Sequence, residues 1–239
     1  MSKQPHVVVV GSTMIDMVAY VKKVPNAGET VIGDSFALGF GGKGANQAVM
    51  ARRLGINVSM VNTLGDDVFG DTTLTNFQEQ GINTSFIART TGASGVAPIW
   101  VEPDGTNRII CVPGANNAMT PAQAKSALES LKGYQIVIGQ LEIPQKVSVQ
   151  AFKTARENGA VTILNPAPFE QLSDELIANC DWIIPNETEF AALGEISANI
   201  LLTEGDKGVH HINTGLKVSA LKVTAIDTTG AGDSFVGAF

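Results

Sequence analysis

Residues 227–235 read DTTGAGDSF, and this stretch carries the most information about the fold and its chemistry. Its glycines allow backbone N–H groups to converge on an anion, and the helix that the pattern predicts next adds positive potential at the same point. Asp233 falls in the first turn of that helix. The segment therefore predicts an anion hole formed by Gly230, Ala231 and Gly232, with a carboxylate beside it.

An anion hole next to a carboxylate suits phosphoryl transfer. The reaction needs groups that stabilise charge on the transferred phosphate and a base that takes the proton of the attacking hydroxyl. Asp233 is the predicted base. Taken alone, the segment is also compatible with a glycine-rich helix start that has no catalytic role, so its interpretation depends on a second motif.

The second motif is the glycine-rich segment 39–47, GFGGKGANQ, which is followed by apolar residues at helical spacing. It is not a P-loop, because no Ser or Thr follows the lysine, and its glycine spacing differs from GxGxxG. Small residues together with Lys43 and Asn46 suit close approach to a hydroxylated ligand. A flexible loop with a helix cap is the alternative for this motif alone.

Hydrophobic runs alternate between strand and helix spacing along the chain, which indicates a doubly wound α/β fold with a mostly parallel central sheet. Most of the parallel strands should be buried on both faces. Strands are expected at 7–10, 58–61, 136–138, 161–164, 182–184 and 221–226, and helices at 44–54, 71–79, 121–131 and 146–157.

Two stretches, at about 16–40 and 92–112, break this rhythm with short alternating segments joined by turn sequences. We expect them to form a small antiparallel sheet beside the ligand-binding end of the main sheet. Such a sheet either acts as a lid that excludes water or decorates an edge. The whole chain, 1–239, is predicted to be one domain that carries these segments.

The composition excludes several functional classes. With 44% hydrophobic and 16% charged residues the chain is typical of a compact globular protein, and its net charge of −7 gives no field that gathers nucleic acid or anionic lipid. Cys111 and Cys180 lie far apart without a CxxC pattern, which argues against a metal site or a disulfide framework. No signal peptide or membrane span is predicted from the first residues, so we expect a cytoplasmic protein.

The segments GGKGANQAVMARRLG (41–55) and DTTGAGDSFVGAF (227–239) resemble, in the same order, the two signature segments of the ribokinase family of carbohydrate kinases. The similarity extends over nearly the whole chain, through PGAN near Gly114, QLE at Glu142, NPAP at Asn165 and PNETE at Asn186. The resemblance implies ATP-dependent phosphorylation of a sugar hydroxymethyl group, with D-ribose converted to ribose 5-phosphate as the leading case. It also implies Mg²⁺, an activating K⁺ and a homodimer formed through the lid.

The family's functional positions carry over residue by residue. The resemblance assigns sugar contacts to Asp16, Gly41, Gly42, Lys43, Asn46, Glu142 and Asp233, and assigns Asp233 as the catalytic base beside the anion hole 230–232. It assigns ATP contacts to Asn186, Thr203, Gly205 and Gly232, Mg²⁺ held through water to Glu189, and K⁺ to Asp227 and Thr229.

Three departures from the family pattern leave alternatives open. Met14 stands where well-known family members have an asparagine that touches the sugar, so fructose, another sugar or a nucleoside are further candidate substrates. The connection between Glu189 and Thr203 is short, and the segments that the family has after Phe239 are missing. These two features favour a non-catalytic sugar-binding protein as the alternative from another class. A dinucleotide-dependent oxidoreductase is weakly supported, because VVVVGST lacks GxGxxG.

Overall fold

The computed structural model describes residues 5–194, 196–225 and 228–239. Its main sheet has nine strands in the order β13-β12-β11-β10-β9-β8-β1-β4-β5. All neighbouring pairs are parallel except β11 with β12 and β12 with β13. The strands are β1 (His6–Val10), β4 (Asn57–Gly65), β5 (Asn83–Thr90), β8 (Ile136–Gly139), β9 (Val161–Leu164), β10 (Trp182–Ile183), β11 (Asn199–Thr203), β12 (Val209–His211) and β13 (Leu216–Val218).

The interior strand β1 contributes side chains to both hydrophobic cores of the protein. Its side chains alternate between the two faces of the sheet, so that Val8 and Val10 enter one core and Val7 and Val9 enter the other. This burial on both faces explains why the strand is a continuous run of valines rather than an alternating pattern.

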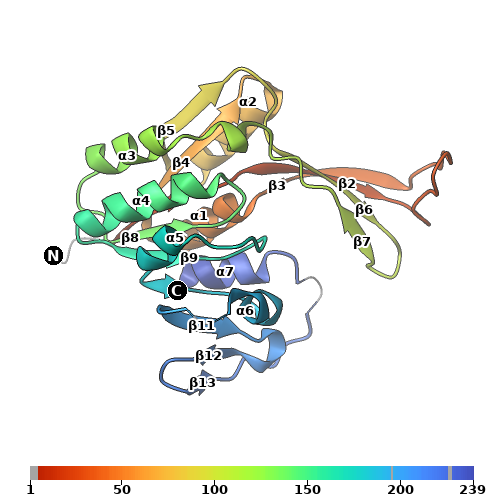
Figure 1. Cartoon of the computed structure of the whole chain (residues 1–239). Helices are drawn as coiled ribbons and strands as arrows, with labels where there is room; N and C mark the ends of the chain where they lie inside the picture. Colours follow the sequence, from red (N-terminus) through yellow and green to blue (C-terminus); the bar gives the residue numbers. More distant parts are fainter. Residues whose placement is uncertain (1–4, 195, 226–227) are drawn as a thin grey trace.

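Helices cover both faces of the sheet (Figure 1). Side chains of α1, α2 and α7 belong to one core, and those of α3, α4 and α5 to the other. The helices are α1 (Lys43–Arg53), α2 (Val68–Glu79), α3 (Pro121–Ser130), α4 (Gln145–Glu157), α5 (Asp174–Ala178), α6 (Glu187–Leu193) and α7 (Ala231–Ala238), with short 3-10 helices η1 (Gly114–Ala118) and η2 (Gly205–Lys207).

Local sequence explains where several helices begin. Thr120 caps α3 and Pro121 occupies its first turn, while Asp67 and Ser173 accept hydrogen bonds from backbone N–H groups at the starts of α2 and α5. These side chains satisfy donors that the first turn of a helix leaves unpaired.

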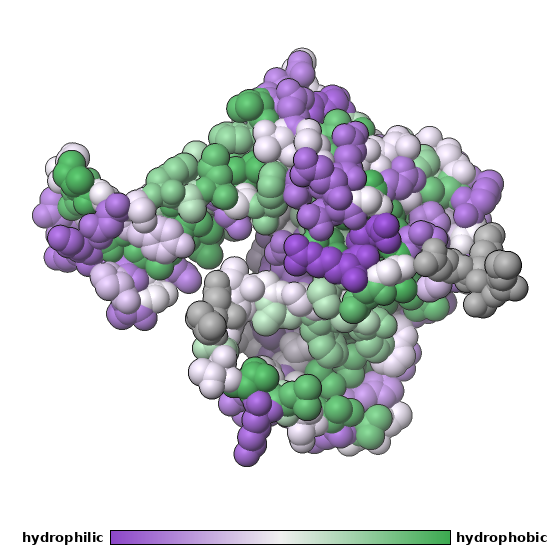
Figure 2. Space-filling model, turned by 180° about the vertical axis from the view of Figure 1, so that it is seen from behind, coloured by the Kyte–Doolittle hydropathy of each residue, from purple (hydrophilic) through white to green (hydrophobic). Residues whose placement is uncertain are grey.

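A second sheet projects from the body of the molecule (Figure 1). It has the order β3-β2-β6-β7 and is built from β2 (Met14–Tyr20), β3 (Ser35–Gly41), β6 (Val96–Val101) and β7 (Asn107–Ile109). The two outer pairings are antiparallel, as expected, and the central pairing of β2 with β6 is parallel because the two segments come from separate excursions of the chain. Figure 2 shows this projection from behind, with hydrophobic residues among polar ones on its surface.

The doubly wound fold and the small separate sheet are confirmed, and most predicted elements agree with the structure to within a few residues. The strand expected at 221–226 is wrong for its described part: residues 221–225 form no strand, and Leu221 and Val223 are exposed. The hairpin β12–β13 already forms that edge of the sheet, so this segment instead leads across to α7. Among the described helices none is long and apolar enough to cross a membrane.

Candidate active site

Predicted site residues and further polar side chains gather where the parallel strands of the main sheet end. Ser12 follows β1, Glu142 follows β8, Asn165 follows β9 and Asn186 follows β10. The carboxyl edge of an open α/β sheet is the usual place for ligands. A cavity of about 200 Å³ lies here, lined by Lys43, Asn165, Ala167, Ile184, Asn186, Glu189, Thr203, Thr228, Gly230, Ala231, Gly232, Asp233 and Val236.

Asp233 is held at the first turn of α7 by two side-chain amides. Its Oδ2 accepts a hydrogen bond from Asn46 Nδ2 at 2.9 Å, and its Oδ1 accepts one from Gln47 Nε2 at 3.2 Å. Only 7% of the residue is exposed. The helix begins at the N-cap Gly230, so its N-terminal N–H groups and the Asp233 carboxylate lie beside the same cavity. The structure thus brings the two glycine-rich motifs into contact.

The glycine-rich loop before α1 is tied to Glu142. The Oε2 atom of Glu142 accepts a hydrogen bond from the backbone N–H of Lys43 at 2.9 Å and another from the hydroxyl of Ser12. The Ser12 Oγ in turn accepts from the N–H of Gly44 at 3.3 Å. One carboxylate therefore joins the loop after β1, the start of α1 and the segment after β8.

Gly42 occupies a position that excludes other residues. Its φ is 90°, and a Cβ atom there would lie 2.8 Å from the backbone nitrogen of Met14 and from Cα of Thr13. The left-handed conformation and the close approach of two backbones both require glycine. The turn of the loop into α1 consequently depends on this residue.

Asp16 faces the same region from strand β2. Burial raises the pKa of its carboxyl, and the nearby negative charge of Glu142 raises it further. Asp16 and Asn46 line one cavity of about 450 Å³ next to Gly230. The Asp16 carboxylate and the Asn46 amide around this cavity provide acceptors and a donor for a polyhydroxylated ligand.

A further cavity, of about 320 Å³, adjoins Glu142 and is partly apolar. Met14, Cys111, Leu141 and Pro168 are among the residues that line it. Met14 is 4% exposed. This wall of the site presents a thioether where a polar side chain would present hydrogen-bonding groups.

Asn186 and Glu189 form a capping box at the start of α6. Asn186 Oδ1 accepts from the N–H of Glu189 at 2.8 Å, and Glu189 Oε2 accepts from the N–H of Asn186 at 2.9 Å. Burial has the largest effect on the Glu189 carboxyl and raises its pKa. The hydrogen bond from the Asn186 N–H and the charge of Lys43 lower this pKa, and the charge of Asp233 raises it. The net result is a raised pKa. The pair lines the cavity together with Thr203, whose strand forms a bridge to Asn186.

The remaining predicted residues lie elsewhere. Gly205 begins η2 after β11 and is not among the residues that line the cavity at Asp233. Thr229 lines the neighbouring cavity that contains Asp16, and Asp227 lies outside the described residues. Within the described ranges, no group of three or more His, Cys, Asp or Glu side chains is arranged to hold a metal ion.

Three polar residues at the site were not predicted. Ser12, Gln47 and Asn165 each hydrogen bond to a predicted residue or to its partner. All three stand in segments already singled out, because Ser12 comes just after the first strand, Gln47 follows Asn46 and Asn165 opens NPAP. Burial of amides next to a carboxylate depends on tertiary contacts, which these patterns do not specify.

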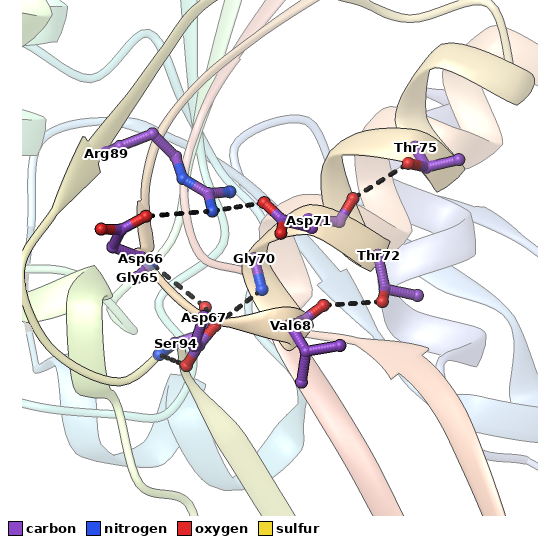
Figure 3. A network of polar contacts seen from close by, with 10 residues as sticks. All are labelled: Gly65, Asp66, Asp67, Val68, Gly70, Asp71, Thr72, Thr75, Arg89 and Ser94. Carbon is purple, nitrogen blue, oxygen red and sulfur yellow. Dashed lines mark hydrogen bonds and ion pairs between the residues drawn. The ribbon is translucent and has the colours of Figure 1, made fainter.

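A polar network anchors the base of the projecting sheet (Figure 3). Asp67 Oδ2 accepts from the N–H of Ser94 at 2.7 Å, and Asp67 Oδ1 accepts from the Ser94 hydroxyl at 2.7 Å and from the N–H of Gly70 at 2.8 Å. Arg89 pairs with Asp71 at 2.6 Å beside it. Asp67 therefore fixes the segment that leads into β6 against the start of α2.

Comparison with known proteins agrees with this geometry. The pattern of the pfkB family carbohydrate kinases matches residues 4–239. A ribokinase of Lactococcus lactis subsp. lactis is 42% identical over 97% of this chain and 81% of its own length, and a deoxyribokinase of Salmonella typhi is 36% identical over 98% and 84%. The solved structure of Arabidopsis thaliana ribokinase complexed with ribose and ATP has a TM-score of 0.88 and 28% identity, and the match covers 99% of this chain and 85% of that one.

The family resemblance seen in the two glycine-rich motifs is thereby confirmed over the whole chain. A family match of this extent, relatives above 30% identity and the shared fold identify the class of enzyme. The chain belongs to the pfkB family of carbohydrate kinases and is a sugar kinase similar to the ribokinases.

Proposed function

We propose that the protein transfers the γ-phosphate of ATP to the hydroxymethyl group of a pentose, with D-ribose as the leading substrate and ribose 5-phosphate as the product. The observation that carries the proposal is the buried Asp233 carboxylate, which is held by two amides at the N-terminus of α7 beside Lys43. The ribokinase relatives named above support the choice of sugar.

In the proposed mechanism, Asp233 accepts the proton of the attacking hydroxyl. Asn46 and Gln47 each donate to one of its oxygens, and the residue lines the cavity that Lys43 also lines. The N–H groups at the start of α7 and the Lys43 side chain stabilise charge on the transferred phosphoryl group. Asp16, Glu142, Asn46 and the loop at 41–43 orient the sugar.

The chain's residues fit Mg²⁺ held through water rather than by a cage of protein ligands. Glu189 lines the cavity at Asp233 and interacts electrostatically with Asp233 and Lys43, while the described residues form no three-ligand cluster. Magnesium retains several waters and commonly binds phosphates together with one or two carboxylates. When bound, it would neutralise charge on the phosphates. An activating K⁺ near Asp227 and Thr229 remains part of the proposal.

A second candidate substrate is 2-deoxy-D-ribose. Met14 is buried in the wall of the cavity at Glu142 and offers no hydrogen bond to a sugar hydroxyl. A sugar that lacks one hydroxyl loses no hydrogen bond at Met14, whereas a hydroxyl placed against this side chain gains none from it. The similarity to a deoxyribokinase over 98% of the chain favours the same candidate.

We further propose that the projecting sheet closes over the sugar and pairs with a second copy of the chain in the cytoplasm. Phe36, Leu38 and Ile109 are exposed on this sheet, which is consistent with coverage by a partner. Light scattering at working concentration tests the dimer, and a monomer would contradict it.

The experiment that tests the proposed function is ADP release with ATP, Mg²⁺ and K⁺ and with D-ribose, 2-deoxy-D-ribose or D-fructose as acceptor. Turnover with a pentose at a kcat/KM well above that with D-fructose supports the proposal. The ratio between the two pentoses decides between the two candidates. Turnover with D-fructose alone, or sugar binding without turnover, would overturn it.

A further inference from the structure

Three buried amide side chains form a continuous chain that starts at Asp233. Gln47 Nε2 donates to Asp233 Oδ1 and to Asn165 Oδ1, both at 3.2 Å, and Gln47 Oε1 accepts from Gln140 Nε2 at 2.6 Å. Gln47 and Gln140 are fully buried, and Asn165 is 8% exposed. None of the three belongs to the set of sugar, ATP or metal contacts described above.

The donors and acceptors around these three hydrogen-bonded amides allow only one set of amide orientations. The backbone carbonyl of Ile184 accepts from Asn165 Nδ2 at 3.0 Å, so the Asn165 oxygen must face Gln47. An ionised Asp233 presents only acceptors as well. The NH₂ group of Gln47 therefore faces both oxygens, and its carbonyl oxygen turns to Gln140, which must donate.

At Gln140, the last of the three amides, this orientation leaves an acceptor atom unpaired in the described part of the structure. Gln140 Oε1 is buried and has no hydrogen-bond partner among the described residues. It points at Gly11, where an added Cβ atom would overlap it. A buried acceptor without a donor is unfavourable. Rotating the Gln140 amide would bring two carbonyl oxygens together at Gln47, so the orientation is imposed from the Asp233 end.

We infer that Gln47 is a positioning residue for the Asp233 carboxylate and that Gln140 fixes the orientation of the Gln47 amide. This inference rests on the proposed role of Asp233 as the base. Gln47 and Asn46 each donate to one carboxylate oxygen from adjacent positions of α1, which sets the plane of the carboxylate. A base must be aligned with the hydroxyl whose proton it takes, and small misplacements slow such reactions strongly.

The sharpest test compares Gln140→Glu with Gln140→Met. In Gln140→Glu, the introduced carboxyl group donates to Gln47 Oε1 while it is protonated, as the amide of Gln140 does, so the chain keeps its orientation. Once ionised, the same group only accepts, which turns the NH₂ group of Gln47 away from Asp233 and brings the Gln47 carbonyl oxygen against the carboxylate. The kcat of Gln140→Glu relative to wild type should therefore fall about tenfold or more as pH rises through the titration of the introduced carboxyl group. For Gln140→Met, which introduces no titrating group, the loss of kcat relative to wild type should be the same at every pH.

Gln47→Met supplies a second, independent readout. It removes the donor to Asp233 with little change in volume, and kcat should fall about tenfold or more while the KM for the sugar changes by less than about threefold. The matched control is Gln150→Met on α4, whose amide hydrogen bonds to Thr154 on the same helix, and its kcat should equal that of wild type. If Gln140→Glu does not fold, as judged by circular dichroism, the Gln47→Met kinetics decide.

Two results would overturn the inference: a Gln140→Glu pH profile parallel to that of Gln140→Met, or a Gln47→Met variant with unchanged kcat. Asp233→Asn separates this failure from failure of the proposed function. If Asp233→Asn retains wild-type turnover, the base assignment itself is wrong. If Asp233→Asn abolishes turnover while the glutamine variants give one of the two results named above, only the positioning role fails.

Discussion

The side-chain amide of Asn46 donates a hydrogen bond to Asp233 Oδ2 at 2.9 Å, across 187 positions of sequence. Asn46 lies in the first turns of α1, next to the loop that is tied to Glu142, and Asp233 lies in the first turn of α7. The loop proposed to hold the sugar and the helix proposed to hold the phosphate therefore share a direct contact at the reacting carboxylate.

Gly42→Ala should weaken sugar binding because the added Cβ overlaps the backbone, an effect beyond that of the left-handed conformation alone. A Cβ at Gly42 would meet Met14 N and Thr13 Cα at 2.8 Å, and its φ is 90°. Gly55 has a similar φ of 87° with nothing within 4 Å, so Gly55→Ala is the matched control. Gly55→Ala should lose about 1 kcal/mol of stability from the left-handed conformation alone, and Gly42→Ala should lose more because of the backbone overlap. Only Gly42→Ala should also raise the sugar KM, and equal KM values for the two variants would contradict this.

Asp67→Ala should destabilise the fold by about 0.5–2 kcal/mol, because it removes the cap of α2 and the anchor of Ser94. Burial opposes ionisation of Asp67, but hydrogen bonds from Ser94 and Gly70 and the charge of Arg89 hold its pKa below the usual range. A lowered folded-state pKa stabilises the protein above the unfolded-state pKa, and this stabilisation is lost as pH falls through the folded-state pKa.

The Tm difference between wild type and Asp67→Ala should therefore be largest near neutral pH and shrink below about pH 4. Asp66→Ala, which removes an exposed carboxylate 3.9 Å from Arg89, is the control and should change stability by less than about 1 kcal/mol. A Tm difference for Asp67→Ala that stays constant from neutral to acid pH would argue against this origin.

Met14→Asn should shift the preference toward D-ribose. The new amide stands in the buried wall beside Glu142 and gains a partner from a hydroxylated sugar, whereas a deoxy sugar leaves it unpaired. The ratio of kcat/KM for D-ribose to that for 2-deoxy-D-ribose should rise at least about tenfold. Met17→Asn on the same strand is the control. An unchanged ratio would show that Met14 does not face the sugar.

Glu189→Gln separates the charge of this residue from its structural role. Glutamine preserves the capping box with Asn186, so Tm should change little. Loss of the carboxylate should raise the Mg²⁺ concentration for half-maximal activity about tenfold. An unchanged Mg²⁺ dependence at unchanged Tm would limit Glu189 to capping α6.

Much of the fold follows from local patterns. The valine run at 7–10 and the helical spacing after GGKG place β1 and α1 within a residue or two, because burial on both faces and helix periodicity leave direct traces in the sequence. The expected strand at 221–226 had suitable residues as well. Whether it pairs depends on a free sheet edge, and the hairpin β12–β13 occupies that edge.

The candidate site was predictable in its motifs and less so in its internal contacts. Asp233 and Asn46 stand in glycine-rich segments with a clear chemical rationale. Gln47 was adjacent but unassigned, because its role depends on Gln140 and Asn165, which approach it from the segments just after β8 and β9. Similarly, the parallel pairing of β2 with β6 depends on how two distant excursions meet.

The most direct test of the proposed mechanism is the kcat of Asp233→Asn, measured by ADP release with the preferred pentose in the presence of ATP, Mg²⁺ and K⁺. Asparagine keeps the size of the side chain and removes the base, so kcat should fall by about 10²- to 10⁴-fold while the fold, judged by circular dichroism, stays intact. A kcat within a few-fold of wild type, with the same sugar and an intact fold, would contradict the assignment of Asp233 as the catalytic base.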